Sequence, residues 1–513
     1  MGNSDIEQVQ ALETRSEPEK TPGKAFRGDY ATGVVDMSPV EKRLLIKARL
    51  LLATLMALMY FAAYLDRHSI GNASVMGMAK DLHIGAHDYS NVLSMFYVGY
   101  VICMLPANII QRKFSPHYIV GTSCTIFGLS VACMAAARNY GAMLGLRILV
   151  GFAQSFIQGM TVYLSLWFRR DEIAGIAAII YSAATISGAF GGFIAYGIEK
   201  NAKLSLAVSG LEPWRWLFII EGCIGVFVGI LFYTMLPQFP DKLQERGGKH
   251  WFFTKEEIDV ACERTSSFNT MGAKVEVRQI LIALTSPLSW GFALVNGGVA
   301  SGIATIGVFL PTFVRELGYS KGKQAFYLVN AQLFSVIPYA VAFVSILVAN
   351  HLSDRFNKKG IPLVCCLSTA TIGLIVIMTE APTAGKMAAL CLVASGVYPS
   401  VTLLAAWCGS NIAGFTKRAT TWAMAEITGQ CLSIMATKIY NTPPRYFKGH
   451  GVLLGLLAFG VIDCVVLMWW MRKENVRREA EVGAYMARGE AHPHESKSLE
   501  DVQDLHVSFR YII

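Results

Sequence analysis

Apolar stretches long enough to cross a lipid bilayer recur along most of this chain. Each crossing needs about 20 residues, and about twelve such stretches lie between residues 48 and 472. The pattern predicts an all-α integral membrane protein. Its expected spans are 48–77, 90–110, 118–137, 140–165, 173–198 and 214–236, then 287–312, 325–349, 361–379, 387–409, 419–440 and 451–472.

A polar stretch separates the sixth span from the seventh. Two groups of six spans are the layout of paired six-helix repeats. Because six is an even number, both tails and the polar linker should lie on one side, and basic clusters in the tails favour the cytoplasm. We expect the final tail, after Arg472, to be solvated and mostly disordered apart from its closing FRYII. The predicted units are a tail (1–46), a six-helix bundle (47–236), the linker (237–286), a second six-helix bundle (287–472) and a tail (473–513).

The composition fits a membrane protein and argues against several other classes. Of 513 residues, 53% are hydrophobic and 16% are charged, whereas soluble domains carry about a quarter charged residues. The net charge of +9 reflects basic loops and tails and does not indicate nucleic-acid binding. The 11 cysteines have no spacing suited to disulfides or a metal site. Without a hydrolase triad or a phosphate-binding glycine loop, we expect neither an enzyme nor an ATP-driven pump, and no cofactor.

Three consecutive ionisable residues, Asp66, Arg67 and His68, lie in the first predicted span, in the stretch YLDRHSIGNA. A charge at the bilayer centre costs about 2.5–3.5 kcal/mol on insertion scales, so each needs a cavity, a partner or an interface. Adjacent helical positions are rotated by about 100°, so the three side chains point in different directions. The Arg67 face, with Tyr64, suits a solvated cavity in which the guanidinium binds a carboxylate. We expect Asp66 to face a neighbouring helix and His68 to lie at the outer mouth.

The fourth span carries a polar stripe along one helical face, formed by Arg147, Gly151, Gln154, Gln158 and Thr161. Lipid offers no hydrogen bonds, so this stripe should line a cavity or contact polar partners. The two glutamines are candidate substrate ligands, although glutamines also join helices. We expect Arg147 to pair with Asp66 or to act in gating. Asp66 is then either its structural partner or a proton carrier, and the sequence alone does not separate these roles.

The eleventh span carries a second polar stripe, formed by Glu426, Gln430, Ser433 and Thr437. Glu426 is a candidate proton carrier, and the alternative is a carboxylate paired with Lys417 or Arg418 near the membrane surface. In the fifth span, the spacing of glycines 188 and 192 predicts close helix packing. Further candidate cavity residues are Asn296, Asn330, Tyr398, Trp407 and Asn411.

The loop NHLSDRFNKKG, between the second and third spans of the second half, resembles the loop signature of the major facilitator superfamily. Asp354, Arg355 and Lys358 supply its acid and basic positions. Such charges can latch helix ends together in one conformation and release them in another. The matching first-half loop, ANIIQRKFSPHY, keeps basic residues such as Arg112 but contains no acid. The resemblance assigns these four residues to gating.

Several further stretches narrow the resemblance: LDRHSIGNA, RILVGFAQSFIQG, YLSLWFRRDEIAG, WRWLFIIEG, WCGSNIAGFTKRA and NTPPRYFKGH. Together they resemble the anion:cation symporter family, in particular its fungal branch of allantoate and vitamin (nicotinate-like) permeases. The resemblance covers nearly the whole chain and implies the major facilitator fold and proton-coupled transport of a small organic anion. This chain departs from the family pattern at Gln154, where relatives commonly use an acid in proton coupling. Another residue must then carry the proton, or coupling has been lost.

We therefore predict a secondary active transporter that takes up a small carboxylate together with protons by alternating access between its two bundles. Arg67 would attract the anion, and Asp66 or Glu426 would exchange protons. The protein should be a monomer in the plasma membrane, with both termini in the cytoplasm. The alternatives are an exporter of a fungal secondary metabolite and a non-transporting nutrient sensor. The sequence does not name the substrate.

Overall fold

The structure is a computed structural model in which the regular secondary structure of the described residues is helical. The described residues are 38–168, 170–201, 210–248, 250–266, 277–319, 331–440, 445–488, 504, 506 and 509–513.

Long helices follow the predicted spans. Those of the first half are α3 (Thr54–Val75), α5 (Ala86–Lys113), α6 (Pro116–Met134), α7 (Tyr140–Gln154), α9 (Arg170–Lys200) and α11 (Pro213–Met235). Those of the second half are α15 (Pro287–Val314), α17 (Val336–Phe356), α18 (Gly360–Met378), α19 (Thr383–Asn411), α20 (Phe415–Ile439) and α21 (Phe447–Arg488). Among the described residues, 10 helices are long and apolar enough to cross a membrane. Helix α20 is of similar length and carries the polar side chains Glu426, Gln430 and Ser433 of the central cavity.

Local sequence explains where several helices begin. Proline occupies the first position of α6, α11 and α15, where its missing N–H leaves no hydrogen bond unmade. Helix α7 begins after Asn139, whose Oδ1 accepts a hydrogen bond from the Ala142 amide at 2.8 Å. Such side-chain caps satisfy amide groups that have no partner within the helix. Each of these starts lies at the edge of a predicted span.

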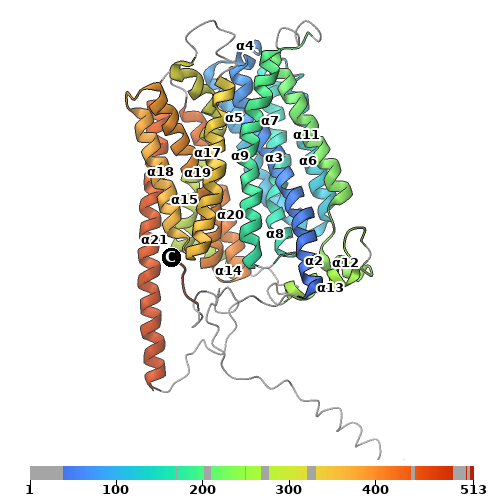
Figure 1. The fold of residues 1–513 in the computed structure, drawn as a ribbon, viewed down its shortest axis with the longest axis vertical. Helices are drawn as coiled ribbons and strands as arrows, with labels where there is room; N and C mark the ends of the chain where they lie inside the picture. Colours follow the sequence, from blue (N-terminus) through green and yellow to red (C-terminus); the bar gives the residue numbers. More distant parts are fainter. Residues whose placement is uncertain are drawn as a thin grey trace, which may run out of the picture.

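Most helix contacts join helices of the same half. In the first half α6 packs on α11, α5 on α7 and α3 on α9, and in the second α15 packs on α20 and α18 on α19. Glycines permit the closest of these contacts, since a Cβ at Gly222 of α11 would lie 2.5 Å from the Ala132 amide of α6. The halves meet where α3, α5 and α9 contact α15, α20 and α17 respectively. Figure 1 shows the two groups of helices side by side.

The polar linker forms short helices at one end of the bundle, here called the linker end. They include α12 (Pro240–Glu245), α13 (Lys255–Ser266) and α14 (Val277–Thr285), and α4 (Met78–Asp81) marks the opposite, α4 end (Figure 1). Helix α13 contacts α2 (Pro39–Ala48), where Lys47 forms an ion pair with Glu257 at 2.9 Å. Arg264 of α13 also pairs with Glu41 at 2.8 Å and with Glu172 at 2.6 Å. The linker is thereby fixed to the first half.

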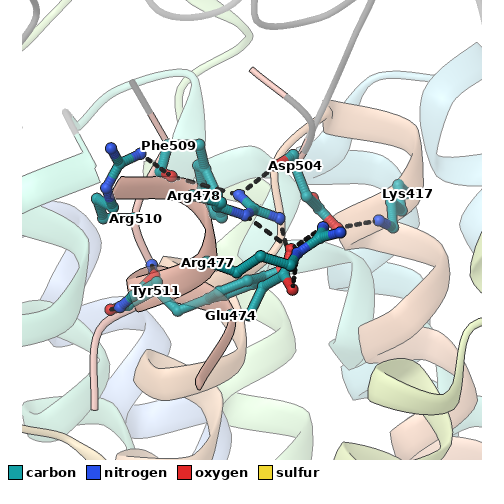
Figure 2. Close-up of polar contacts among 9 residues, drawn as sticks. Lys417, Glu474, Arg477, Arg478, Asp504, Phe509, Arg510 and Tyr511 are labelled. Carbon is teal, nitrogen blue, oxygen red and sulfur yellow. Dashed lines mark hydrogen bonds and ion pairs between the residues drawn. The ribbon is translucent and has the colours of Figure 1, made fainter. Parts of the chain in front are cut away.

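The C-terminal residues bind the linker end of the second half. Figure 2 shows Asp504 between Lys417 of α20 and Arg478 of α21. The Asp504 carboxylate also accepts a hydrogen bond from the Ala413 amide at 3.0 Å. Lys417 therefore pairs with Asp504 at this end of α20. The expectation of a solvated, mostly disordered tail also needs correction, because α21 continues as a helix to Arg488 and Asp504 is buried against the bundle.

Two residues predicted to line the cavity instead hold the end of the chain. Trp407 Nε1 donates a hydrogen bond to the Ile512 carbonyl oxygen at 2.8 Å. The Asn411 side chain donates to the same oxygen at 2.9 Å and accepts from the Ile512 amide at 2.7 Å. The assignment of Trp407 and Asn411 to the cavity is therefore wrong. The closing FRYII was predicted not to be solvated like the rest of the tail. This prediction is confirmed, since residues 509–513 contact these helices.

Candidate functional site

A narrow cavity of about 60 Å³ lies between the two halves of the protein. Helices α3, α5 and α9 line it from the first half, and α15 and α20 line most of the other side. Its wall is aromatic and polar, and it brings a cation from one half to the same space as an acid from the other. The polar and aromatic lining residues are Tyr60, Tyr64, Arg67, His68, Tyr97, Tyr100, Tyr181, Asn296, Glu426, Gln430 and Ser433.

Arg67 of α3 lies in the wall of this cavity, as its helical face predicts. Its guanidinium carbon is 4.8 Å from the ring centres of Tyr64 and Phe96, and 5.3 Å from that of Tyr100. Flat contacts of this kind stabilise a guanidinium without neutralising it. Its Nε donates a hydrogen bond to Gln154 Oε1 at 3.2 Å. The rings and the amide therefore fix the orientation of a cation that lines the cavity.

Gln154 connects Arg67 to a buried ion pair behind the cavity wall. Its Nε2 donates to Asp66 Oδ2 at 3.3 Å, while its Oε1 accepts from Arg67. A carboxylate at this position could accept from Arg67 but could not donate to an ionised Asp66, so the amide suits a place between a cation and an ionised acid. Arg147 Nη1 lies 3.3 Å from Asp66 Oδ1. Asp66 and Arg147 thus form the predicted pair, and both are almost completely buried.

The second half contributes an acid and two amides to the opposite wall. Gln430 Nε2 donates to Glu426 Oε2 at 3.4 Å, so these two residues of α20 form one polar group in the cavity. Asn296 of α15 donates to the Ala425 carbonyl oxygen at 2.8 Å. This bond ties α15 to α20 beside the cavity. A bound molecule would therefore have Arg67 on one side and Glu426 on the other.

His68 does not lie at the outer mouth, as the sequence suggested, but is buried in the cavity wall. Its Nδ1 is 3.4 Å from the Ser187 hydroxyl, and its Nε2 is 3.4 Å from the Tyr398 hydroxyl of the second half. Its ring centre is 5.0 Å from that of Tyr339. The prediction considered the first helix alone, whereas Tyr339 of α17 and Tyr398 of α19 cover His68 from the second half.

Glycines bring the two halves together between the cavity and the α4 end. A Cβ at Gly71 of α3 would lie 2.1 Å from the Val308 carbonyl oxygen of α15. A Cβ at Gly188 of α9 would lie 2.5 Å from the Tyr339 ring of α17. Separations this short leave no room for a side chain. The α4 end is therefore closed above the cavity by direct contact between helices.

The comparisons with known proteins agree with this arrangement. A family model described as Major Facilitator Superfamily matches residues 56–437. The chain belongs to this superfamily. It is 27% identical to the high-affinity nicotinic acid transporter of Saccharomyces cerevisiae, over 98% of this chain and 92% of that protein. It is 30% identical to the MFS-type transporter efuF of Hormonema carpetanum, over 90% and 92% of the two chains.

Solved structures support the same fold. The inward-open structure of the xylose transporter XylE from E. coli aligns with a TM-score of 0.61 at 13% identity, covering 82% of this chain and 95% of that one. The chain is thus an integral membrane transporter of the major facilitator superfamily rather than an enzyme. Substrate sites of such proteins lie near the middle of the membrane between the two halves. The cavity around Arg67 also lies between the two halves.

The remaining predicted residues of this major facilitator protein lie in several places. Tyr398 contacts His68 from behind the cavity wall. Asp354 forms an ion pair with Lys359 in the turn after α17, and Arg355 and Lys358 are exposed there. Asn330 and the side chains of Gln158 and Arg112 lie outside the described residues. The gating role of the loop residues stays a prediction.

Sequence reasoning missed two tyrosines and an acid in this major facilitator protein. Tyr97 and Tyr100 of α5 line the cavity, but tyrosines in a membrane helix are more often interface anchors, and spacing alone does not separate the two cases. Glu221 of α11 is buried near the Asp66–Arg147 pair. The sequence feature that could have identified Glu221 is an acid within an apolar span, in the motif WRWLFIIEG. Acids inside membrane helices are candidates for a functional role.

We expect Gly71→Ala to force α3 and α15 apart at the α4 end, because the added methyl group would overlap the Val308 carbonyl oxygen. Spin labels at the α4 ends of these helices should report a longer distance, and transport should slow. The matched control is Gly145→Ala, since a Cβ at Gly145 meets nothing within 4 Å. An unchanged label distance in Gly71→Ala would show that the contact does not close this end.

Proposed function

We propose that the protein takes up a small organic anion bearing a carboxylate together with protons. The observation that carries the proposal is Arg67, a cation that lines the cavity between the halves and is oriented by Tyr64, Phe96 and Gln154. A guanidinium forms two parallel hydrogen bonds with a carboxylate. Tyrosine rings on the surrounding wall suit a planar organic group attached to that carboxylate.

The proposed substrate class is a vitamin-like or allantoate-like monocarboxylate. The similarity to a nicotinic acid transporter over 98% of the chain supports this class, as do the motifs shared with the fungal allantoate and vitamin permease branch. Asn296, Gln430 and Ser433 would bind the polar atoms of the substrate on the wall opposite Arg67.

Proton coupling is proposed for acids next to the substrate. Asp66 contacts both Arg147 and Gln154, so its protonation would weaken the ion pair and alter the side chain that orients Arg67. Glu426 lines the cavity itself and is the second candidate. We place the protein in the plasma membrane as a monomer, with the linker end in the cytoplasm, so that the close contacts at Gly71 and Gly188 shut the outer side.

An uptake measurement tests this proposal. Cells that express the full chain should accumulate radiolabelled nicotinate or another small monocarboxylate faster at acidic than at neutral external pH. A protonophore should abolish the accumulation, because it removes the driving gradient. Accumulation that rises with the protonophore would indicate export, the alternative direction. Ligand binding to purified protein without flux in proteoliposomes would indicate a sensor and overturn transport.

A further inference from the structure

Glu221 is a buried acid that the proposed transport scheme does not use. It lies on α11, one helical turn after Phe218, on the face that packs against the first-half bundle. Only 4% of the residue is exposed. Neither of its carboxyl oxygens makes a hydrogen bond in this structure. A buried carboxylate without partners is costly in hydrocarbon, so this residue needs a physical explanation.

Glu221 belongs to the surroundings of the Asp66–Arg147 pair. The Arg147 guanidinium carbon is 6.0 Å from the ring centre of Phe218, so the cation reaches the α11 face that carries Glu221. Asp66 and Arg147 are the charged groups that act on Glu221 within the described part of the chain, although α6 and α9 also pack against α11. Three ionisable side chains, from α3, α7 and α11, therefore share one buried region.

The hydrogen bonds of Arg147 are incomplete on the side away from Asp66. Its Nη1 contacts Asp66, but its Nε and Nη2 are buried and make no hydrogen bond. The unused donors of Arg147 and the unused acceptors of Glu221 are complementary. One guanidinium thus acts electrostatically on two carboxyl groups and is hydrogen-bonded to only one of them in this structure.

Charge balance decides how the three groups are ionised. Arg67 also acts on Asp66, but it shares the cavity with Glu426, which can balance its charge. With Asp66 and Arg147 both charged, these two and Glu221 are then neutral only when Glu221 carries a proton, because an uncompensated charge is costly inside the membrane. Ser69 of α3, which lies beside Glu221, agrees with this state. Its hydroxyl donates to the Leu65 carbonyl oxygen at 2.6 Å, so it has a lone pair but no proton to offer. A protonated carboxyl group can donate to it, whereas a carboxylate cannot.

We propose that Glu221 holds a proton while Arg147 is paired with Asp66, and that Arg147 changes partner when Asp66 is protonated. In the second state Arg147 pairs with an ionised Glu221, and Asp66 carries the proton. The cluster contains one proton in both states and stays neutral, while the proton moves from one carboxyl group to the other. Glu221 would then supply a titratable group beside Gln154, whose amide cannot carry the proton. This inference rests on the proposed proton coupling.

Transport by Glu221→Gln tests the role in coupling. With one proton per anion, a gradient of about one pH unit drives accumulation of about tenfold, and wild-type proteoliposomes should reach this level with nicotinate. We expect Glu221→Gln to lose this accumulation but to keep nicotinate counterflow, which needs no net proton movement. The control Asp463→Asn removes a half-buried acid of α21, far along the chain from the cluster, and should behave as wild type. Wild-type accumulation in Glu221→Gln would overturn the proposal.

Infrared spectroscopy tests the protonation state without any substrate. At neutral pH in lipid, the wild-type spectrum should contain a carbonyl stretch of a protonated carboxylic acid that is missing from the spectrum of Glu221→Gln. In Asp66→Asn the same band should also disappear, because Arg147 then pairs with an ionised Glu221. Identical spectra for wild type and Glu221→Gln would contradict the assignment, whatever the protein transports. If the wild type transports no carboxylate but shows the band, the proposed function fails and the protonated Glu221 stands.

Discussion

Arg67→Ala is expected to abolish carboxylate uptake while the protein still reaches the membrane. Removing one partner of a desolvated charge pair costs about 2–5 kcal/mol of binding, which corresponds to a loss of about 30-fold or more in affinity. The loss should be large here because Arg67 is the cation in the cavity lining, held by the rings of Tyr64, Phe96 and Tyr100. Uptake of radiolabelled nicotinate, normalised to surface protein, measures the effect.

Two controls separate charge from geometry in this experiment. Arg67→Lys keeps the positive charge but not the planar fork or its stacking on the rings, so it should restore only part of the uptake. Arg445→Ala removes an exposed arginine that pairs with Glu380 at 3.3 Å, and exposed pairs contribute about 0–1 kcal/mol, so uptake should be unchanged. Full uptake by a correctly folded Arg67→Ala protein would remove Arg67 from the mechanism.

Arg147→Leu is expected to destabilise the fold more than any other single change discussed for this protein. It removes the cation of a buried ion pair and leaves the Asp66 carboxylate without its partner. Breaking a buried pair in this way costs about 3–5 kcal/mol. Thermal unfolding of purified protein, followed by circular dichroism, should show a clearly lowered midpoint. Ile148→Ala, a change of a neighbouring exposed residue on the same helix, should cause a much smaller shift.

The double variant Asp66→Asn with Arg147→Gln distinguishes stability from coupling. Removing both charges leaves no uncompensated ion, so much of the stability lost in Arg147→Leu should return. Proton-driven accumulation should stay absent, because the groups that change partner are gone. If the double variant accumulated the anion like wild type, the pair would be structural only, which is the other role that the sequence allowed for Asp66.

The apolar pattern alone predicted the long helices and the polar linker, because crossing a membrane requires uninterrupted apolar helices. Helical phase also predicted that Arg67 and Asp66 point in different directions. It did not predict that Trp407 and Asn411 bind the end of the chain, or that His68 lies deep in the bundle. The helical periodicity of the sequence shows which residues share a face of one helix. The packing of the helices decides which residues of other helices that face contacts. Glu221 was missed for the same reason, since the charged groups that act on it come from α3 and α7.

The tyrosine wall around the cavity has a consequence for how such a protein can evolve. Five of the lining residues are tyrosines, from α3, α5 and α9. A change from tyrosine to phenylalanine removes one hydroxyl group and keeps the ring, so the shape of the wall survives. A site that hydrogen-bonds a substrate group rejects an analogue that lacks it, so each such step would alter which ligand is preferred. Descendants of one ancestral gene could thus acquire new nutrients by single nucleotide changes while the Arg67 anchor stays in place.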